Sequence, residues 1–182
     1  MEVTLRIRPV FLAALLAILA LPAAARPVEL EPHLLPFKPL VGKTWRGVFP
    51  NSKPEKPVVD VSRFETALNG QAVRNLHSIN DGDYGGEAIF TFDAEKKAIV
   101  YTYVTTGGFY TTGTVEAEAG GFKSHEVVHG SATGPSEVEA TSRILPDGRL
   151  HVKSRYLKDG KWADGHEIFY SVDAKAVVKF KD

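Results

Sequence analysis

The sequence predicts an all-β protein: a single antiparallel up-and-down barrel of about 8–10 strands, preceded by a short capping segment. Short segments rich in β-branched and aromatic residues follow one another almost to the C-terminus. The separators contain turn residues such as Asn69-Gly70 and Asp147-Gly148, and no long amphipathic helix lies between two segments. Parallel crossovers are therefore excluded, and a meander this long usually closes because an open sheet leaves unpaired edges.

The first strand is expected to begin near Trp45. The later strands are bounded by Gly-containing turns, which supply the positive φ angles that tight hairpins need. We expect these strands at residues 58–68, 71–79, 84–93, 97–105, 109–118, 122–129, 137–145, 149–157 and 162–172.

Composition restricts the kinds of chemistry that are expected. A length of 182 residues, 43% of them hydrophobic and 24% charged, is ordinary for one globular domain. Lys+Arg 22 against Asp+Glu 22 gives a formal net charge of +0, so a nucleic-acid partner is not expected. Cys 0 excludes disulfides and thiolate nucleophiles, and it is compatible with an oxidising compartment.

The N-terminus has the pattern of a secretory signal peptide over residues 1–25. Arg6 and Arg8 form the positive region, an apolar run covers residues 10–21, and three alanines precede the expected cleavage before Arg26. The apolar run is shorter than the roughly 20 residues of a membrane span. We therefore expect a periplasmic or secreted protein with no membrane span after cleavage.

Residues 26–41 are expected to form a capping segment, and residues 42–182 the barrel domain. The capping segment contains four prolines, which exclude a long helix. Leu34, Leu35, Phe37 and Leu40 nevertheless form an apolar patch. One or two helical turns that cover one end of the barrel would bury it.

Period-2 alternation in the late strands predicts which side chains face the interior. Ser142 shares a face with Val138 and Ile144, for example, and it lies between Thr141 and Arg143 of the opposite face. The polar residues predicted to face inward are Ser142, Ser154, Tyr156, Asp164, His166 and Tyr170. A barrel packed only for stability would rarely bury so many polar groups, because each needs a partner. The pattern therefore predicts an interior cavity for a ligand or water.

The stretch Gly42-Lys43-Thr44-Trp45-Arg46-Gly47, with the glycine-rich run at residues 84–93, resembles the calycin superfamily of lipocalin and fatty-acid-binding-protein-like barrels. The chain looks most like small bacterial lipocalin-like domains of unknown function, but Gly42 lies three positions before the Trp rather than two. The resemblance covers residues 37–172. It implies a barrel with an interior site, in a superfamily whose members bind lipids, retinoids, bilins or haem and include a few cyclases.

The expected function is therefore an exported lipocalin-like barrel that binds or carries a small, largely apolar ligand, which the six inward polar groups would orient. We assign no catalytic residue and lean towards a protein that is not an enzyme. The sequence identifies neither a cofactor nor an oligomeric state. A packed barrel with a structural or partner-binding role is a further alternative.

The motif His125-Glu126-Val127-Val128-His129 matches the H-E-x-x-H pattern of zinc proteases and gives an enzymatic alternative, a zinc-dependent hydrolase. That chemistry needs a helix over residues 124–130, so that both imidazoles reach one ion. The valines favour a strand, in which the two histidines stand roughly 13 Å apart. We therefore favour a coincidental match within a strand.

His166 supports a third alternative, a haem-binding barrel. In lipocalin-like haem-binding barrels of the nitrobindin type an inward His on a late strand ligates the iron, and His166 is predicted to face inward beside Tyr170. The simpler interpretation is a core histidine that a neighbouring Asp or Tyr satisfies. The same simpler interpretation is favoured for His77.

Overall fold

The computed structural model describes residues 28–181, so the predicted signal peptide lies outside the described residues. Its elements are two short 3-10 helices and ten strands. They are η1 (Pro32–Phe37), β1 (Thr44–Val48), β2 (Val59–Ala67), η2 (Leu68–Gly70), β3 (Ala72–Ile79), β4 (Tyr84–Asp93), β5 (Ala98–Thr105), β6 (Tyr110–Glu118), β7 (Gly121–His129), β8 (Glu137–Ile144), β9 (Leu150–Lys158) and β10 (Lys161–Val172). None of the helices within the described part of the chain has the length and apolarity to cross a membrane.

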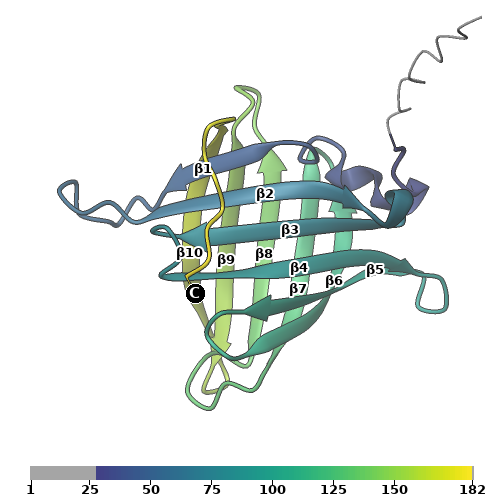
Figure 1. Cartoon of the computed structure of the whole chain (residues 1–182). Helices are drawn as coiled ribbons and strands as arrows, with labels where there is room; N and C mark the ends of the chain where they lie inside the picture. Colours follow the sequence, from purple (N-terminus) through teal and green to yellow (C-terminus); the bar gives the residue numbers. More distant parts are fainter. Residues whose placement is uncertain (1–27, 182) are drawn as a thin grey trace, which may run out of the picture.

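The predicted fold class is confirmed: the strands form one closed antiparallel barrel in which every strand pairs with its neighbours in sequence. Closure comes from β1, which pairs with β2 on one side and with β10 on the other. In Figure 1 the early strands β2–β4 run across the page in front of β7–β9, which run up it, so the two halves of the barrel face each other across its interior.

One end of the barrel is filled by the segment before β1. Leu34 and Phe37 of η1 are fully buried, and the Phe37 ring lies 4.7 Å from that of Phe90 and 4.8 Å from that of Phe122. Trp45 packs beside them, and its indole Nε1 donates to the Leu40 carbonyl at 3.3 Å. These contacts make this end an apolar floor.

The opposite end is formed by five connections, which we call the mouth loops. They are residues 49–58, 80–83, 106–109, 130–136 and 159–160. Each of these loops joins two strands that extend from the mouth towards the η1 end of the barrel. No helix in the described residues covers the mouth loops, so the two ends of the barrel are built differently.

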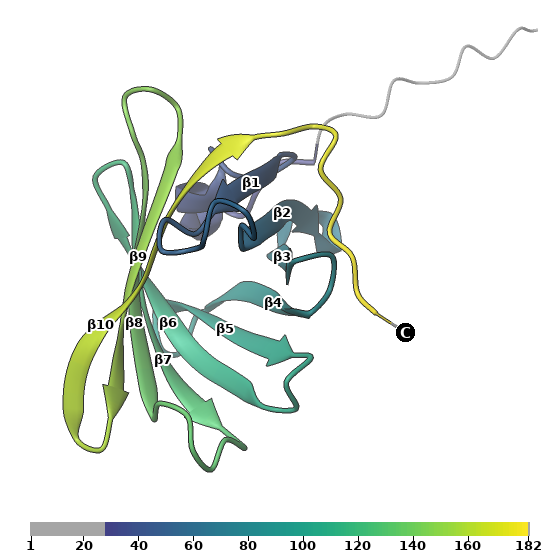
Figure 2. The ribbon, with the colours of Figure 1, turned by 90° about the vertical axis from the view of Figure 1, so that its left-hand side faces the viewer.

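The chain after β10 crosses the outside of the barrel to the β3–β4 hairpin (Figure 2). There the Lys179 backbone N–H donates to the Ser78 hydroxyl at 3.0 Å, and Ser78 is almost completely buried. Lys179 also pairs with Asp81 at 2.9 Å, and Lys181 pairs with Asp83. The C-terminal segment is thus tied to the early strands.

The apolar floor should contribute strongly to stability. Phe37→Ala removes a fully buried ring, and we expect it to lower the free energy of unfolding by about 3–5 kcal/mol in urea denaturation. The matched control is Leu35→Ala in the same helix, where the side chain is 48% exposed and the expected loss is below about 1 kcal/mol. Equal, small losses in both variants would contradict this description of the η1 end.

Candidate functional site

The interior of the barrel contains a cavity of about 610 Å³, a size typical of small-molecule sites. Mouth-loop residues such as Phe49, Phe109 and Ser131 contribute to its lining, so the cavity extends from the apolar floor to the mouth loops. Most of its wall is aliphatic or aromatic. The deeper apolar lining includes Phe64, Phe90, Phe122, Leu150, Val152 and Ile168.

Five of the six residues predicted to face inward line this cavity. These residues are Ser142, Ser154, Tyr156, His166 and Tyr170. Ser154 is also used structurally, because its hydroxyl accepts from the His166 backbone N–H at 2.8 Å. The His166 ring makes edge-on contacts with Phe49, at 5.2 Å between centroids, and with Tyr156, at 5.5 Å.

The predicted inward position of Asp164 is wrong. The pairing of β10 with β9 shifts between Asp164 and Glu167, which is the mark of a β-bulge. The extra residue reverses the alternation, so that His166 faces the cavity whereas Asp164 lies opposite Arg155 on the outer face. Arg155 in turn binds Glu139 on the same outer face, at 2.8 Å.

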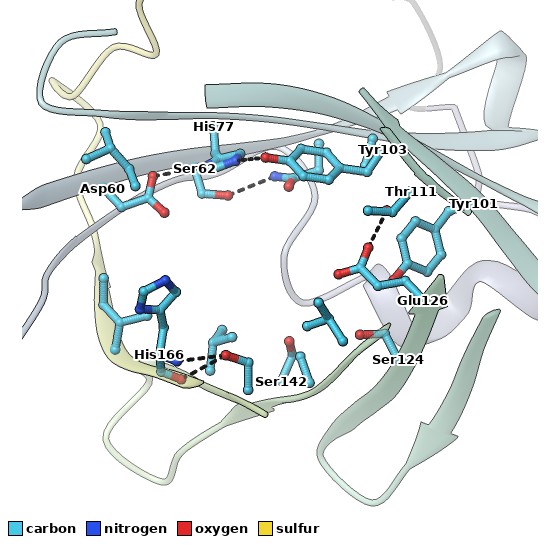
Figure 3. A pocket seen from close by; sticks show the side chains of 18 of the residues that line it. Asp60, Ser62, His77, Tyr101, Tyr103, Thr111, Ser124, Glu126, Ser142 and His166 are labelled. Carbon is cyan, nitrogen blue, oxygen red and sulfur yellow. Dashed lines mark hydrogen bonds and ion pairs between the residues drawn. The ribbon is translucent and has the colours of Figure 1, made fainter. Parts of the chain in front are cut away.

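A connected group of polar side chains lies against the early strands, and we call it the Asp60 network (Figure 3). Asp60 accepts a hydrogen bond from the Tyr170 hydroxyl at 2.8 Å and contacts His77 Nδ1 at 3.2 Å. The other ring nitrogen of His77 lies 2.6 Å from the Tyr103 hydroxyl, which donates to that of Tyr84 at 3.2 Å. The network therefore links β2, β3, β4, β5 and β10 across the cavity wall.

Glycines on neighbouring strands make room for the rings of two tyrosines. A Cβ at Gly86 of β4 would lie 2.5 Å from the Tyr103 ring, and one at Gly113 of β6 would lie 2.8 Å from the Tyr101 ring. Both distances are too short for real contacts, so each ring occupies the space that a side chain would otherwise fill. Covering a strand glycine with a cross-strand aromatic ring is a known way of stabilising a curved sheet.

Glu126 is the second polar centre, on the far side of the cavity from Asp60 (Figure 3). Its carboxylate accepts a hydrogen bond from the Thr111 hydroxyl, and the side chain is half-buried against the cavity. Burial raises the pKa of the Glu126 carboxyl, and hydrogen bonds from Thr111 and Tyr101 partly oppose this rise. A carboxyl in this setting can accept from, or when protonated donate to, a group inside the cavity.

The cavity tyrosines are hydrogen-bonding groups that stay neutral. Burial raises the pKa of Tyr84, Tyr101, Tyr103 and Tyr156, and that of Tyr170 is raised by burial and by the adjacent Asp60. At neutral pH each of these hydroxyls therefore keeps its proton.

The zinc-hydrolase alternative required a helix over residues 124–130, and that requirement is not met. The residues belong to strand β7, in which Ser124, Glu126 and Val128 face the cavity. His125 and His129 face outward, where His125 Nε2 lies 2.7 Å from Glu137. Across the described residues no group of three His, Cys, Asp or Glu side chains is arranged to hold a metal ion.

Sequence reasoning missed Asp60 and Tyr103 and assigned Glu126 to the wrong pattern. The alternation of Phe122, Ser124, Glu126 and Val128 contains the signal that places Glu126 inside, but the match to H-E-x-x-H drew attention to the two histidines instead. No local signal links Asp60 to Tyr103, because the register of three strand pairs brings them together.

Comparison with known proteins supports the fold. The chain is similar in structure to Rv2717c from M. tuberculosis, with a TM-score of 0.53 and 14% sequence identity over 79% of this chain and 98% of that chain. At this identity the similarity shows a shared fold and says nothing about activity. No protein-family model and no curated protein sequence matches the chain.

The raised pKa of Glu126 predicts a pH-dependent stability. Its protonated form is favoured in the folded state, so this stabilisation is complete below the unfolded pKa of about 4.3 and is lost as pH rises through the folded pKa. Glu126→Gln stays neutral at every pH. We therefore expect the free energy of unfolding of Glu126→Gln, minus that of the wild type, to be larger at pH 7 than at pH 4.

Urea denaturation at the two pH values measures this difference. Glu116→Gln makes the same chemical change on the exposed outer face of β6 and serves as the control for the substitution itself. If the difference in free energy of unfolding between Glu126→Gln and the wild type stays constant or decreases from pH 4 to pH 7, folding does not disfavour the ionised form of Glu126.

Proposed function

We propose that this protein is an exported calycin-type barrel that binds or carries a small, largely apolar molecule in its interior. The observation that supports this best is the cavity of about 610 Å³, whose wall is mostly apolar with a few converging polar groups. Transfer of apolar ligand surface from water to such a wall is favourable by roughly 25 cal/mol per Å². The proposal is therefore based on the cavity and its lining, and not on the fold alone.

The arrangement of the ends favours a ligand that enters past the mouth loops and lies with its apolar part on the floor. Phe37, Phe90 and Phe122 pack together at the η1 end and offer only apolar contact. The ionisable groups Asp60, Glu126 and His166 belong to the half of the strands nearer the mouth loops. Polar groups there would orient a ligand through hydrogen bonds while its apolar part excludes water.

Filling the cavity should weaken binding. Ala140 lines the cavity on β8, between Ser124 and Ser154 of the adjacent strands. We expect Ala140→Trp to weaken the binding of the neutral apolar probe N-phenyl-1-naphthylamine, followed by its fluorescence enhancement. The apparent affinity should fall by at least about tenfold, a loss of about 1.4 kcal/mol of binding free energy.

Thr141→Trp adds the same ring to the outer face of the same strand and should leave probe binding unchanged. Circular dichroism and thermal unfolding of both variants establish that the barrel is intact. Probe binding that survives Ala140→Trp in a folded protein would place the binding site elsewhere and overturn the proposal.

A second candidate is a haem-binding barrel, favoured by one observation at His166. Its side chain lines the cavity, and neither ring nitrogen has a hydrogen-bond partner among the described residues. An imidazole nitrogen of this kind could hold haem iron, and haem, when bound, would supply the iron chemistry. Phe49 and Tyr156 would hold the plane of the imidazole.

This candidate predicts a Soret band when haemin is added to the purified protein, and His166→Ala should remove it. His151→Ala is the control, because His151 stacks on Phe169 and binds Glu167 on the outer face. A band of unchanged position and intensity in His166→Ala would exclude His166 as the ligand.

A further inference from the structure

The charges that line the cavity are unusual for a site that binds apolar acids. The lining contains two carboxyl groups, those of Asp60 and Glu126, and among the described lining residues there is no Lys or Arg. A buried carboxylate ligand needs a cationic or multiply donating partner, because desolvation of its charge is otherwise uncompensated. The two histidines of the lining, His77 and His166, are its only basic side chains within the described chain.

Asp60 already has its partners within the protein. The side chain is 5% exposed, one carboxylate oxygen accepts from the Tyr170 hydroxyl at 2.8 Å, and the other faces His77 Nδ1 at 3.2 Å. Both carboxylate oxygens of Asp60 are therefore in use. His77 is likewise engaged at both ring nitrogens, the second by Tyr103 at 2.6 Å.

Glu126 differs from Asp60 in having no basic partner. Its carboxylate accepts hydrogen bonds from the neutral hydroxyls of Thr111 and Tyr101, and no ion pair with a basic side chain forms at Glu126 within the described residues. His125, the adjacent residue, faces outward and pairs with Glu137 instead. Glu126 therefore presents a carboxyl to the cavity that a bound cation would stabilise in its ionised form.

The wall beside Glu126 is also suited to a cation. Tyr101 lies next to Glu126 with its ring 4.8 Å from that of Phe90, and both rings line the cavity. Nearer the mouth loops the rings of Tyr84 and Phe109 stack at 6.5 Å. The faces of aromatic rings attract ammonium groups, most strongly where water is excluded.

From these observations we infer that the cavity selects apolar amines over apolar carboxylates, with the Glu126 carboxylate binding the ammonium group and the apolar floor binding the hydrocarbon part. The inference rests on the proposed function and names the ligand class of that same cavity. An alkyl ammonium forms a charge-assisted hydrogen bond with Glu126, an alcohol forms a neutral one, and a carboxylate meets a like charge. The expected order of affinity is amine, then alcohol, then carboxylate.

The test compares three ligands that share one hydrocarbon chain: dodecylamine, dodecan-1-ol and dodecanoate. Each displaces N-phenyl-1-naphthylamine from the mature protein at pH 7, below the concentration at which the ligand forms micelles. We expect dodecylamine to bind at least about tenfold more tightly than dodecanoate, the size of effect that one partly buried charge pair produces.

Glu126→Gln should reduce this preference to about threefold or less, mainly by weakening the amine. Glu137→Gln is the matched control, because Glu137 lies on the outer face with His125 and should leave the preference unchanged. The wild-type comparison needs no variant, so the inference is testable even where a substitution disturbs folding.

Dodecanoate binding as tightly as dodecylamine, or a preference that persists in Glu126→Gln, would overturn the inference and leave the proposed apolar-ligand function standing. Failure of the probe and of all three ligands to bind the folded protein would overturn the proposed function, and the inference with it.

Discussion

Pairing of β1 with β10 is the interaction on which the rest of the structure depends. It converts a ten-strand meander into a closed barrel and leaves no free sheet edge. Closure also fixes which side chains face inward on every strand, because the side-chain period of two then applies around one common interior. The short segment before β1 fills one end with Phe37, which packs with Trp45 of β1, and the cavity extends from there to the mouth loops.

Within this frame the polar interior has two parts with different physical roles. The Asp60 network is internally satisfied and joins β2 to the last strand, β10, through the Tyr170–Asp60 hydrogen bond at 2.8 Å. It therefore stabilises closure as well as lining the cavity. Glu126, whose pKa is raised by burial, forms no ion pair with a basic side chain in the described part of the chain. The protein itself therefore satisfies the Asp60 network, whereas Glu126 has no counterion among the described residues.

The sequence predicts the barrel well because its turn chemistry and alternation are local. The strand expected at residues 84–93 is found at Tyr84–Asp93, and the one expected at 122–129 is found at Gly121–His129. The cavity-facing positions of Ser142, Ser154, Tyr156, His166 and Tyr170 follow from the same alternation. Whether these residues bind a ligand stays a prediction.

The errors and omissions have non-local causes. Asp164 is misplaced because a β-bulge adds one residue to β10, and a simple period of two cannot anticipate it. The Asp60 network depends on the register of several strand pairs, which sequence alone does not specify. The alternation of residues in β7 predicts that Glu126 faces inward. The residue was instead interpreted through the H-E-x-x-H motif, whose geometry needs a helix.

The central claim is that the barrel interior is a ligand site. Native mass spectrometry of the protein, purified without added ligand, tests this most directly. We expect a discrete extra mass of a small organic molecule that is lost on denaturation. A bare protein that also acquires no adduct after incubation with a mixture of small apolar compounds would contradict the claim and indicate a barrel with a structural role.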